Sequence, residues 1–227
     1  MWELRLARSD RHPKLLQAFH RGQARRLGAI GALRVLTAPT PDADVYLVCA
    51  LDERRRMRGG VRLHRCTAEA PPLAHALGHL PEICAAAADK GGSNLAEVRG
   101  LWVDLKVQGV GLGSALLRAA IASATLINVS RLVAFSHQHQ ERSFADVGLL
   151  LDPSLGEHPY PDDRYRSKVF WCDPVTQVGA TSASRLEVLR MRDQLARTGS
   201  TSWDAPLARR TATEQPAAPS ATVVDSP

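Results

Sequence analysis

The segment from Gln108 to Ser114 has residue types and spacing that suit phosphate binding. Its sequence, QGVGLGS, holds three glycines in five residues, so the backbone can turn tightly and bring bare N–H groups close to a ligand. Residues 97–103 before it alternate polar and apolar side chains, which predicts a strand. Residues 114–124 after it are rich in alanine and leucine, which predicts a helix. The unpaired N–H groups and the positive dipole end of such a helix form an anion site.

Two familiar phosphate-binding loops do not fit this segment. A P-loop ends in Gly-Lys-Ser or Gly-Lys-Thr, whereas this chain has Gly113-Ser114-Ala115 without a lysine. A dinucleotide-binding loop needs Gly-x-Gly-x-x-Gly and an acidic residue about 20 positions later. Here the last glycine is misplaced, and the next expected strand ends at Ser136-His137 without an acid.

The segment instead resembles the acyl-CoA loop of the GCN5-related N-acetyltransferase superfamily, which reads Gln/Arg-x-x-Gly-x-Gly/Ala. Gln108, Gly111 and Gly113 match every defined position, and residues 101–104 (LWVD) are similar to the strand that leads into that loop. The resemblance implies an α/β fold of the α+β type: a mixed, twisted sheet flanked by helices, with splayed central parallel strands. It also implies acetyl-CoA or a longer acyl-CoA as co-substrate, bound by Trp102, Val103, Gln108, Gly109, Val110, Gly111, Leu112, Gly113 and Ser114. The alternative is a glycine-rich turn that only caps a core helix.

Glu97 is the predicted general base. It precedes Gln108 by eleven residues, a spacing that resembles the catalytic glutamate of several histone-type members of the superfamily. At the start of a central strand, partial burial would raise the pKa of the carboxyl, as a base that works through a water requires. The alternative is that Glu97 pairs with Arg99 on the strand face.

The general acid of the superfamily is often a tyrosine four residues before the glycine of a Tyr-x-x-x-Gly-Phe helix end. Phe144 stands at that position here, before Gly148, and it cannot donate a proton. Tyr160 and Tyr165 from the next loop are therefore the predicted acids. The alternative is that their rings only pack, with the hydroxyls at the surface.

His137 and His139 follow the strand expected at residues 131–136 and lie on the same face of it. A neutral His137 there could act as an acid or a base. As i, i+2 neighbours the two imidazoles could also chelate a metal ion, but no third ligand is indicated, so no metal site is predicted. The alternative is a pair of solvated histidines.

A second resemblance leaves the acyl donor open. Residues 59–63 (GGVRL) and the pair Glu97 and Arg99 are similar to strands of acyl-homoserine-lactone synthases and long-chain N-acyl amino acid synthases. Those enzymes share the superfamily fold and take acyl chains from acyl carrier protein. They often lack a clean Gln-x-x-Gly-x-Gly loop, whereas this chain has one, so acetyl-CoA stays the first expectation.

The composition is that of an ordinary globular protein. Of 227 residues, 44% are hydrophobic and 23% are charged. No apolar run approaches the ~18–20 residues of a membrane span, and the charged N-terminal segment is unlike a signal peptide. Four widely spaced cysteines favour reduced thiols. These features predict a cytoplasmic protein without a membrane partner. The net charge of +6 comes with scattered arginines and no nucleic-acid motif, so nucleic acid is not a predicted partner.

The chain is predicted to have three parts: an acyltransferase domain over residues 1–174 that includes an N-terminal helix, a helical extension over 175–197, and a disordered tail over 198–227. Strands are expected at residues 35–40, 44–51, 59–66, 97–103, 131–136 and 168–172. Helices are expected within residues 1–30 after a start near Ser9, within 71–88 as one or two pieces broken at Pro81, and at 114–124, 141–147 and 184–197.

The predicted function is acyl transfer from a CoA thioester to an acceptor amine by direct attack. One alternative is synthesis of N-acyl amino acids or homoserine lactones from acyl carrier protein. Another is a non-catalytic acyl-CoA sensor, which Phe144 in place of tyrosine would favour. The predicted partners are a small-molecule or protein amine and, for the synthase alternative, acyl carrier protein. A homodimer is an open option.

Overall fold

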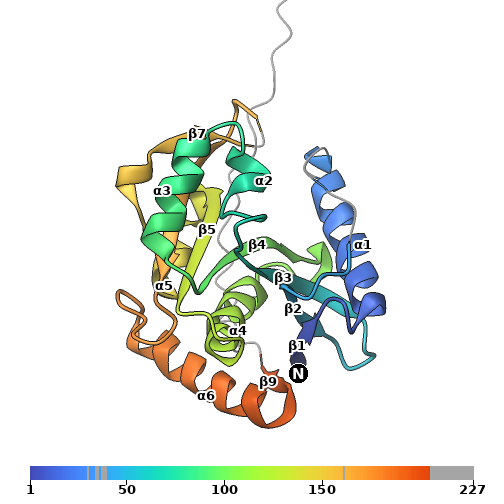
Figure 1. The fold of residues 1–227 in the computed structure, drawn as a ribbon. Coiled ribbons are helices and arrows are strands. Elements are labelled where there is room, and N and C mark those ends of the chain that lie inside the picture. Colours follow the sequence, from blue (N-terminus) through green and yellow to red (C-terminus); the bar gives the residue numbers. More distant parts are fainter. Residues whose placement is uncertain (30, 34–35, 37–39, 161, 205–227) are drawn as a thin grey trace, which may run out of the picture.

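A large mixed sheet organises the chain. The computed structural model describes residues 1–29, 31–33, 36, 40–160 and 162–204. Within these residues, nine strands form one sheet in the order β6-β8-β5-β4-β3-β2-β1-β9, with β7 paired to β8 (Figure 1). The strands are β1 (Trp2–Arg8), β2 (Val45–Leu51), β3 (Met57–Arg65), β4 (Leu95–Val103), β5 (Arg131–His137), β6 (Leu150–Leu151), β7 (Glu157–Pro159), β8 (Arg166–Cys172) and β9 (Ser200–Trp203).

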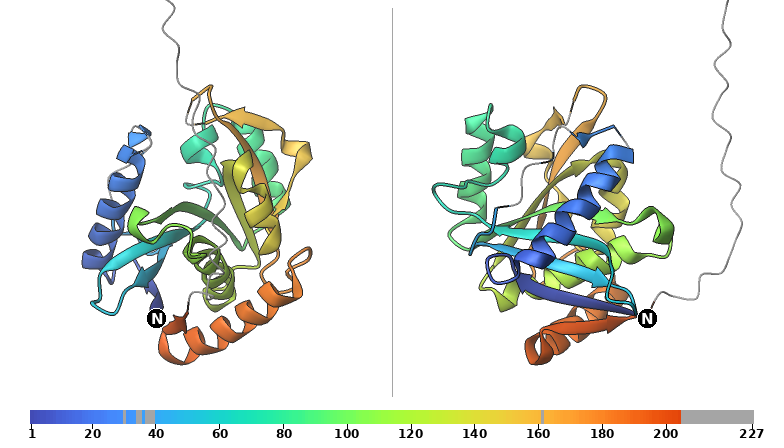
Figure 2. Two further views of the ribbon diagram at one scale, coloured as in Figure 1. Left: turned by 180° about the vertical axis from the view of Figure 1, so that it is seen from behind. Right: turned by 90° about the vertical axis from the view of Figure 1, so that its right-hand side faces the viewer.

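Helices cover both faces of the sheet, as Figures 1 and 2 show. Helices α4, α5 and α6 pack on one face, where they share a core with the strands. Helix α1 and the pair α2–α3 lie on the other face, over two smaller apolar clusters. The helices are α1 (Pro13–Ala29), α2 (Ala74–Leu77), α3 (Pro81–Gly91), α4 (Leu112–Leu126), α5 (Glu141–Asp146) and α6 (Ser182–Thr198). Among the described residues, no helix is both long and apolar enough to cross a membrane.

Strands β4 and β5 form the parallel pair at the centre. Their residues pair from Leu95 with Arg131 to Val98 with Ala134, and beyond that point no pairing is formed. β4 nevertheless continues to Val103 and β5 to His137. The predicted mixed sheet with splayed central strands is therefore confirmed. The crossover between the two strands is α4, as the strand–loop–helix pattern predicts.

Side chains alternate between the two faces of the sheet along β4, so one face receives apolar residues and the other receives Glu97. Ala96 and Val98 join the core under α4, whereas Glu97 points to the opposite face. The register against β3 shifts beside Gly100, which has φ of 66°. Trp102 consequently packs under α1, where a Cβ built on Gly22 would lie 2.0 Å from the indole ring. The small residue at Gly22 is what lets α1 approach β4 so closely.

Both ends of the described chain differ from the sequence-based expectation. Residues 2–8 form β1, because the pattern WELRLAR places apolar side chains at every second position. Residues 198–204, expected within a disordered tail, complete α6 and form β9, which pairs with β1. Trp203 anchors β9 in the main core. Residues 205–227, and most of the strand expected at 35–40, lie outside the described residues.

The remaining expected elements are found close to their predicted positions. The strands expected at 44–51, 59–66, 97–103, 131–136 and 168–172 correspond to β2, β3, β4, β5 and β8. Pro81 does separate two short helices, but it does so as the first residue of α3. Proline suits this position because the first turn of a helix has no partner for its N–H.

Candidate functional site

The start of α4 presents free backbone N–H groups. Gly111 is the N-cap of α4, with φ of 83° in the left-handed region. The N–H of Ala115 donates to the carbonyl of Gly111 at 3.1 Å. The N–H groups of the three residues between them, 112–114, therefore precede the first intrahelical bond and are open to an anion.

The loop before α4 leaves room for a ligand. Among the described residues, a Cβ built on Gly109 would meet no atom within 4 Å, one on Gly111 only Trp203 at 3.9 Å, and one on Gly113 only Val103 at 3.9 Å. The side chain of Leu112 is buried in the main core and Val110 packs against it, so both anchor the loop. Gln108 is exposed at its start.

The end of β4 adds a further free N–H group. The N–H of Asp104 donates to the carbonyl of Arg58 on β3 at 2.7 Å. Because backbone N–H groups alternate between the two sides of a strand, the N–H of Val103 points away from β3, to the side where β5 has separated. The side chain of Trp102 is buried beside Phe19 of α1, with ring centroids 6.0 Å apart. The cofactor contact predicted for Trp102 therefore stays a prediction for its backbone alone.

Glu97 lies further back on the same strand and is almost fully buried, with 3% of its side chain exposed. The N–H of Leu73 donates to Oε2 at 3.2 Å. Nδ1 of His75 lies 3.0 Å from Oε1, and the guanidinium of Arg99 lies 3.8 Å from Oε2. Oε2 thus accepts a hydrogen bond, whereas Oε1 has the close contact with His75 but no hydrogen bond among the described residues.

These partners decide the protonation of Glu97. Burial acts to raise the pKa of the carboxyl, but contact with His75, the charge of Arg99 and the N–H of Leu73 outweigh burial and lower the pKa below its usual value. The sequence analysis expected a raised pKa from partial burial. Complete burial brings hydrogen-bond partners with it, so Glu97 is held as a carboxylate.

More positive charge than negative surrounds this carboxylate. Arg62 and His64 of β3 point to the same face as Glu97 and Arg99 of β4, and His64 is the register partner of Glu97. Burial, followed by the charge of Arg99, lowers the pKa of Arg62 to about 10 and also lowers the pKa of His64. We call the set Arg62, His64, His75, Glu97 and Arg99 the Glu97 cluster.

Arg62 is the least compensated member of the Glu97 cluster. Its guanidinium lies 5.6 Å from the ring centroid of Phe19, a cation–π contact. It forms no ion pair within 4 Å among the described residues, and its Nε is buried there without a hydrogen-bond partner. A buried guanidinium of this kind is a receptor for an added anion.

The predicted acids fall into two places. The ring of Tyr160 lies 6.0 Å from that of His75 and 5.6 Å from that of Phe135, beside the Glu97 cluster. Burial raises the pKa of Tyr160. Tyr165 lies 5.5 Å from His137 between ring centroids, at the end of β5.

His137 belongs to a separate group of rings. It lies 4.4 Å from His139 between ring centroids, and burial, followed by the charge of His139, lowers its pKa. No recorded contact joins this group to the Glu97 cluster in the described part of the chain. Nor do the described residues contain a cluster of three or more His, Cys, Asp or Glu that could hold a metal ion.

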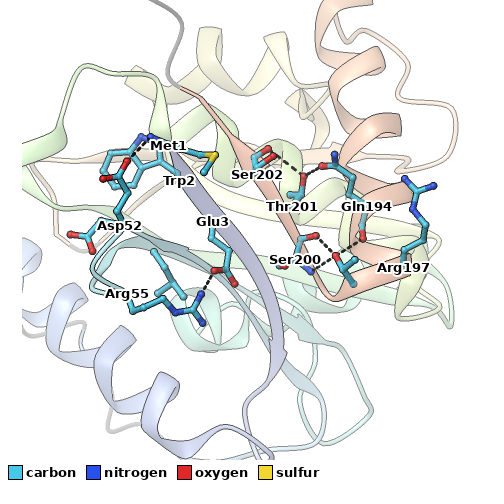
Figure 3. A pocket seen from close by; sticks show the side chains of 13 residues that line it. Met1, Trp2, Glu3, Asp52, Arg55, Gln194, Arg197, Ser200, Thr201 and Ser202 are labelled. Atoms are coloured by element: carbon cyan, nitrogen blue, oxygen red, sulfur yellow. Dashed lines mark hydrogen bonds and ion pairs between the residues drawn. The ribbon is translucent and has the colours of Figure 1, made fainter.

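A cavity of about 600 Å³ lies elsewhere, between β1, β9, the β2–β3 turn and the end of α6 (Figure 3). Its polar side chains are largely paired with one another: Arg55 with Glu3, and Thr201 with Gln194. None of the predicted site residues lines it.

Some positions of the Glu97 cluster could be predicted from the sequence, and one could not. Arg62 and His64, and likewise Glu97 and Arg99, are i, i+2 pairs on adjacent predicted strands, so alternation alone puts each pair on one face. His75 was not predicted, because it reaches Glu97 only through the tertiary position of the short helix α2.

The fold is shared with acyl transfer enzymes. The chain is similar to the CoA-dependent acyl-homoserine lactone synthase MesI, with 14% identity and a TM-score of 0.60 over 84% of this chain and 95% of that one. It is also similar to the CoA-dependent acyl-homoserine lactone synthase BjaI with SAM and isopentyl-CoA, with 15% identity and a TM-score of 0.61 over 84% and 90%. FeeM, an N-acyl amino acid synthase from uncultured soil microbes, aligns with 12% identity and a TM-score of 0.57 over 82% and 98%.

At the level of sequence, no protein-family model and no curated protein matches the chain. The structural similarity confirms the predicted fold, a mixed, twisted sheet flanked by helices.

The state of Glu97 makes a prediction about stability. Glu97→Gln removes the charge and should destabilise the protein at pH 7 by on the order of 2 kcal/mol, because Arg99 and His75 lose a charged acceptor. Since the folded pKa lies below the ordinary value of 4.5, the contribution is fully present above pH 4.5 and is lost as the pH falls through the folded pKa. Urea unfolding of both proteins from pH 7 to pH 3 measures it.

The control is Glu141→Gln, which removes an exposed carboxylate 3.5 Å from Lys168 and should change stability by less than about 0.5 kcal/mol. A gap between wild type and Glu97→Gln that stays constant, or that widens, on acidification would contradict the lowered pKa.

Proposed function

We propose that the chain is an acyl-CoA-dependent N-acyltransferase that moves an acyl group from a thioester to an acceptor amine by direct attack. One observation carries the proposal. The free N–H groups at the start of α4 lie at the end of β4, where β4 has separated from β5, and the Glu97 cluster lies further back on the same strand. Backbone donors that suit a phosphate thus lie near the end of the strand that carries Glu97 and Arg99.

The donor would be held mainly by backbone. The N–H groups of residues 112–114 suit the pyrophosphate of coenzyme A, because they combine unpaired donors with the positive end of a 15-residue helix. The N–H of Val103 suits the thioester oxygen, on which negative charge develops during attack. The CoA-dependent synthases with this fold support a CoA donor. Acyl carrier protein is the alternative donor, and we place the reaction in the cytoplasm.

The charge of the Glu97 cluster supports an acceptor that carries a carboxylate. Arg62 and Arg99 are both on the cluster's face of the sheet, and the carboxylate of Glu97 is already engaged by Arg99 and His75. An amino acid would bring its own carboxylate, a second one beside that of Glu97, into contact with Arg62. Its amine would then lie close to Arg62. FeeM, an N-acyl amino acid synthase of the same fold, supports this class of acceptor.

The donor site is tested with Gly113→Glu. Its Cβ fits without a clash, so the fold should be kept, while the carboxylate would stand among N–H groups meant for phosphate. The affinity for acetyl-CoA, measured by isothermal titration calorimetry, should fall on the order of tenfold or more. Leu186→Glu, which adds the same charge on the exposed face of α6, should bind like wild type.

Two results would count against the donor site. One is wild-type affinity in Gly113→Glu. The other is a wild-type protein that neither acetyl-CoA, longer acyl-CoAs nor acyl carrier protein stabilises in a thermal shift experiment. Stabilisation by acyl carrier protein alone would select the alternative donor.

The acceptor class is tested by pairing each amino acid with the amine that lacks its carboxylate. Wild type should prefer the amino acid. Arg62→Gln should raise the KM for the amino acid on the order of 30-fold, since a charge-assisted contact is worth about 2 kcal/mol. The rate with the matched amine should be unchanged. The release of the CoA thiol from acetyl-CoA or octanoyl-CoA measures the reaction with the amino acid and with the matched amine.

Arg185→Gln on the exposed side of α6 is the control and should leave both rates as in wild type. Equal rates with the amino acid and its matched amine in wild type would contradict the assignment of Arg62.

A further inference from the structure

The buried state of Glu97 leaves the proposed reaction without a proton acceptor. A carboxylate whose pKa is lowered, and which lies against the N–H of Leu73, His75 and Arg99, binds a proton poorly. The group that takes the proton from the acceptor amine must therefore be another member of the cluster.

His75 stands between this carboxylate and the solvent. Its Nδ1 lies 3.0 Å from Oε1 of Glu97, and 25% of its side chain is exposed, against 3% for Glu97. A neutral imidazole that carries its proton on Nδ1, the nitrogen beside the carboxylate, has its lone pair on Nε2. Within the described part of the chain, no hydrogen bond to Nε2 is recorded.

The backbone before His75 is fixed by the same carboxylate. Leu73, two residues earlier, has φ of 63°, a left-handed conformation that is rare for a branched apolar residue. Its N–H donates to Oε2 of Glu97, and its fully buried side chain, with that of Leu77, holds α2 against the sheet. One carboxylate thus positions both the imidazole and the turn that carries it, and such strain gathers at functional sites.

The charged and ionisable groups around His75 come from three elements. Glu97 and Arg99 lie on β4, and Arg62 and His64 lie on β3. Tyr160 lies after β7, with its ring edge-on to the imidazole at 6.0 Å. Among these groups Glu97 alone supplies negative charge, and it is the one in contact with His75.

We propose that His75 is the general base of the acyl transfer and that Glu97 is its positioning residue. The proposal rests on the proposed function. Nε2 of His75 takes one proton from the acceptor ammonium, and the freed lone pair forms a C–N bond with the thioester carbon. The C–S bond then breaks, and the thiolate takes the second proton that the nitrogen loses. Glu97 stabilises the imidazolium that results, as an acidic partner does in a catalytic triad.

The other ionisable groups around His75, His64 of the cluster and Tyr160 beside it, fit this role less well. His64 faces Arg99, and burial together with that charge lowers its pKa, so it holds a proton weakly. Tyr160 has a pKa raised by burial, so it keeps its proton at neutral pH. Among the described residues, neither contacts a carboxylate as His75 does.

The test is the pH dependence of kcat/KM for the chain with octanoyl-CoA or acetyl-CoA and the protein amino acid that wild type accepts best. Wild type should lose activity on acidification along a limb set by His75. His75→Gln should be about 100-fold slower or more at pH 7.5 and should lose that limb, with an unchanged affinity for the CoA thioester. Added imidazole should restore part of the rate of His75→Ala.

Glu97→Gln should keep the limb but lower kcat/KM, because the imidazolium that forms during attack loses its carboxylate partner. His79→Gln, an exposed histidine just beyond α2, should match wild type in rate and profile. His64→Gln should keep the position of the acid limb.

The outcomes separate the two proposals. If wild type binds CoA thioesters and transfers acyl groups but His75→Gln keeps its rate and acid limb, the assignment of His75 is overturned and the proposed function stands. Loss of activity together with a lower melting temperature, and no rescue of His75→Ala by imidazole, would show a structural role and also overturn it. If wild type transfers no acyl group to any amine, with or without a carboxylate, both proposals fall.

Discussion

The early separation of β4 from β5 is the constraint on which the proposed chemistry depends. The two strands pair only from Leu95 to Val98, so the remainder of β4 has a partner on one side alone. Backbone polar groups in a sheet are normally satisfied by both neighbours. The unpaired side of β4, including the N–H of Val103, therefore has to be satisfied by solvent or by a ligand. The chain passes from β4 through a short 3-10 helix, Leu105–Val107, and the glycine loop into α4, and the free N–H groups of residues 112–114 lie close to Val103 at the end of β4.

The second constraint is the buried charge of Glu97. Burying a carboxylate is unfavourable unless it is paired and hydrogen-bonded, and here the partners come from three segments: Leu73, His75 and Arg99. Removing a carboxylate with this many partners destabilises the fold, and the carboxylate itself is a poor proton acceptor. The same contacts hold the partly exposed imidazole of His75 in one orientation. The carboxylate of Glu97 is thus both a structural group and, in the proposed mechanism, the group that positions His75.

Much of this arrangement could be predicted from the sequence because it is local. The strand, glycine loop and helix from Glu97 to Ala124 follow one another along the chain, so their periodicity and glycine spacing predicted the site at α4. The contacts that were missed join distant segments. His75 meets Glu97 across 22 positions, and β9 pairs with β1 from the other end of the chain. The pKa of Glu97 was expected to rise, because sequence reveals burial more readily than the partners that burial brings.

The central claim is that a CoA thioester binds where β4 separates from β5, with its pyrophosphate at α4. A crystal structure of the protein with a non-hydrolysable thioether analogue of acetyl-CoA tests it most directly. The account predicts pyrophosphate oxygens within about 3 Å of the N–H groups of residues 112–114, and an acyl oxygen facing the N–H of Val103. The analogue in the cavity between β1 and β9, or with its pyrophosphate away from α4, would contradict the account.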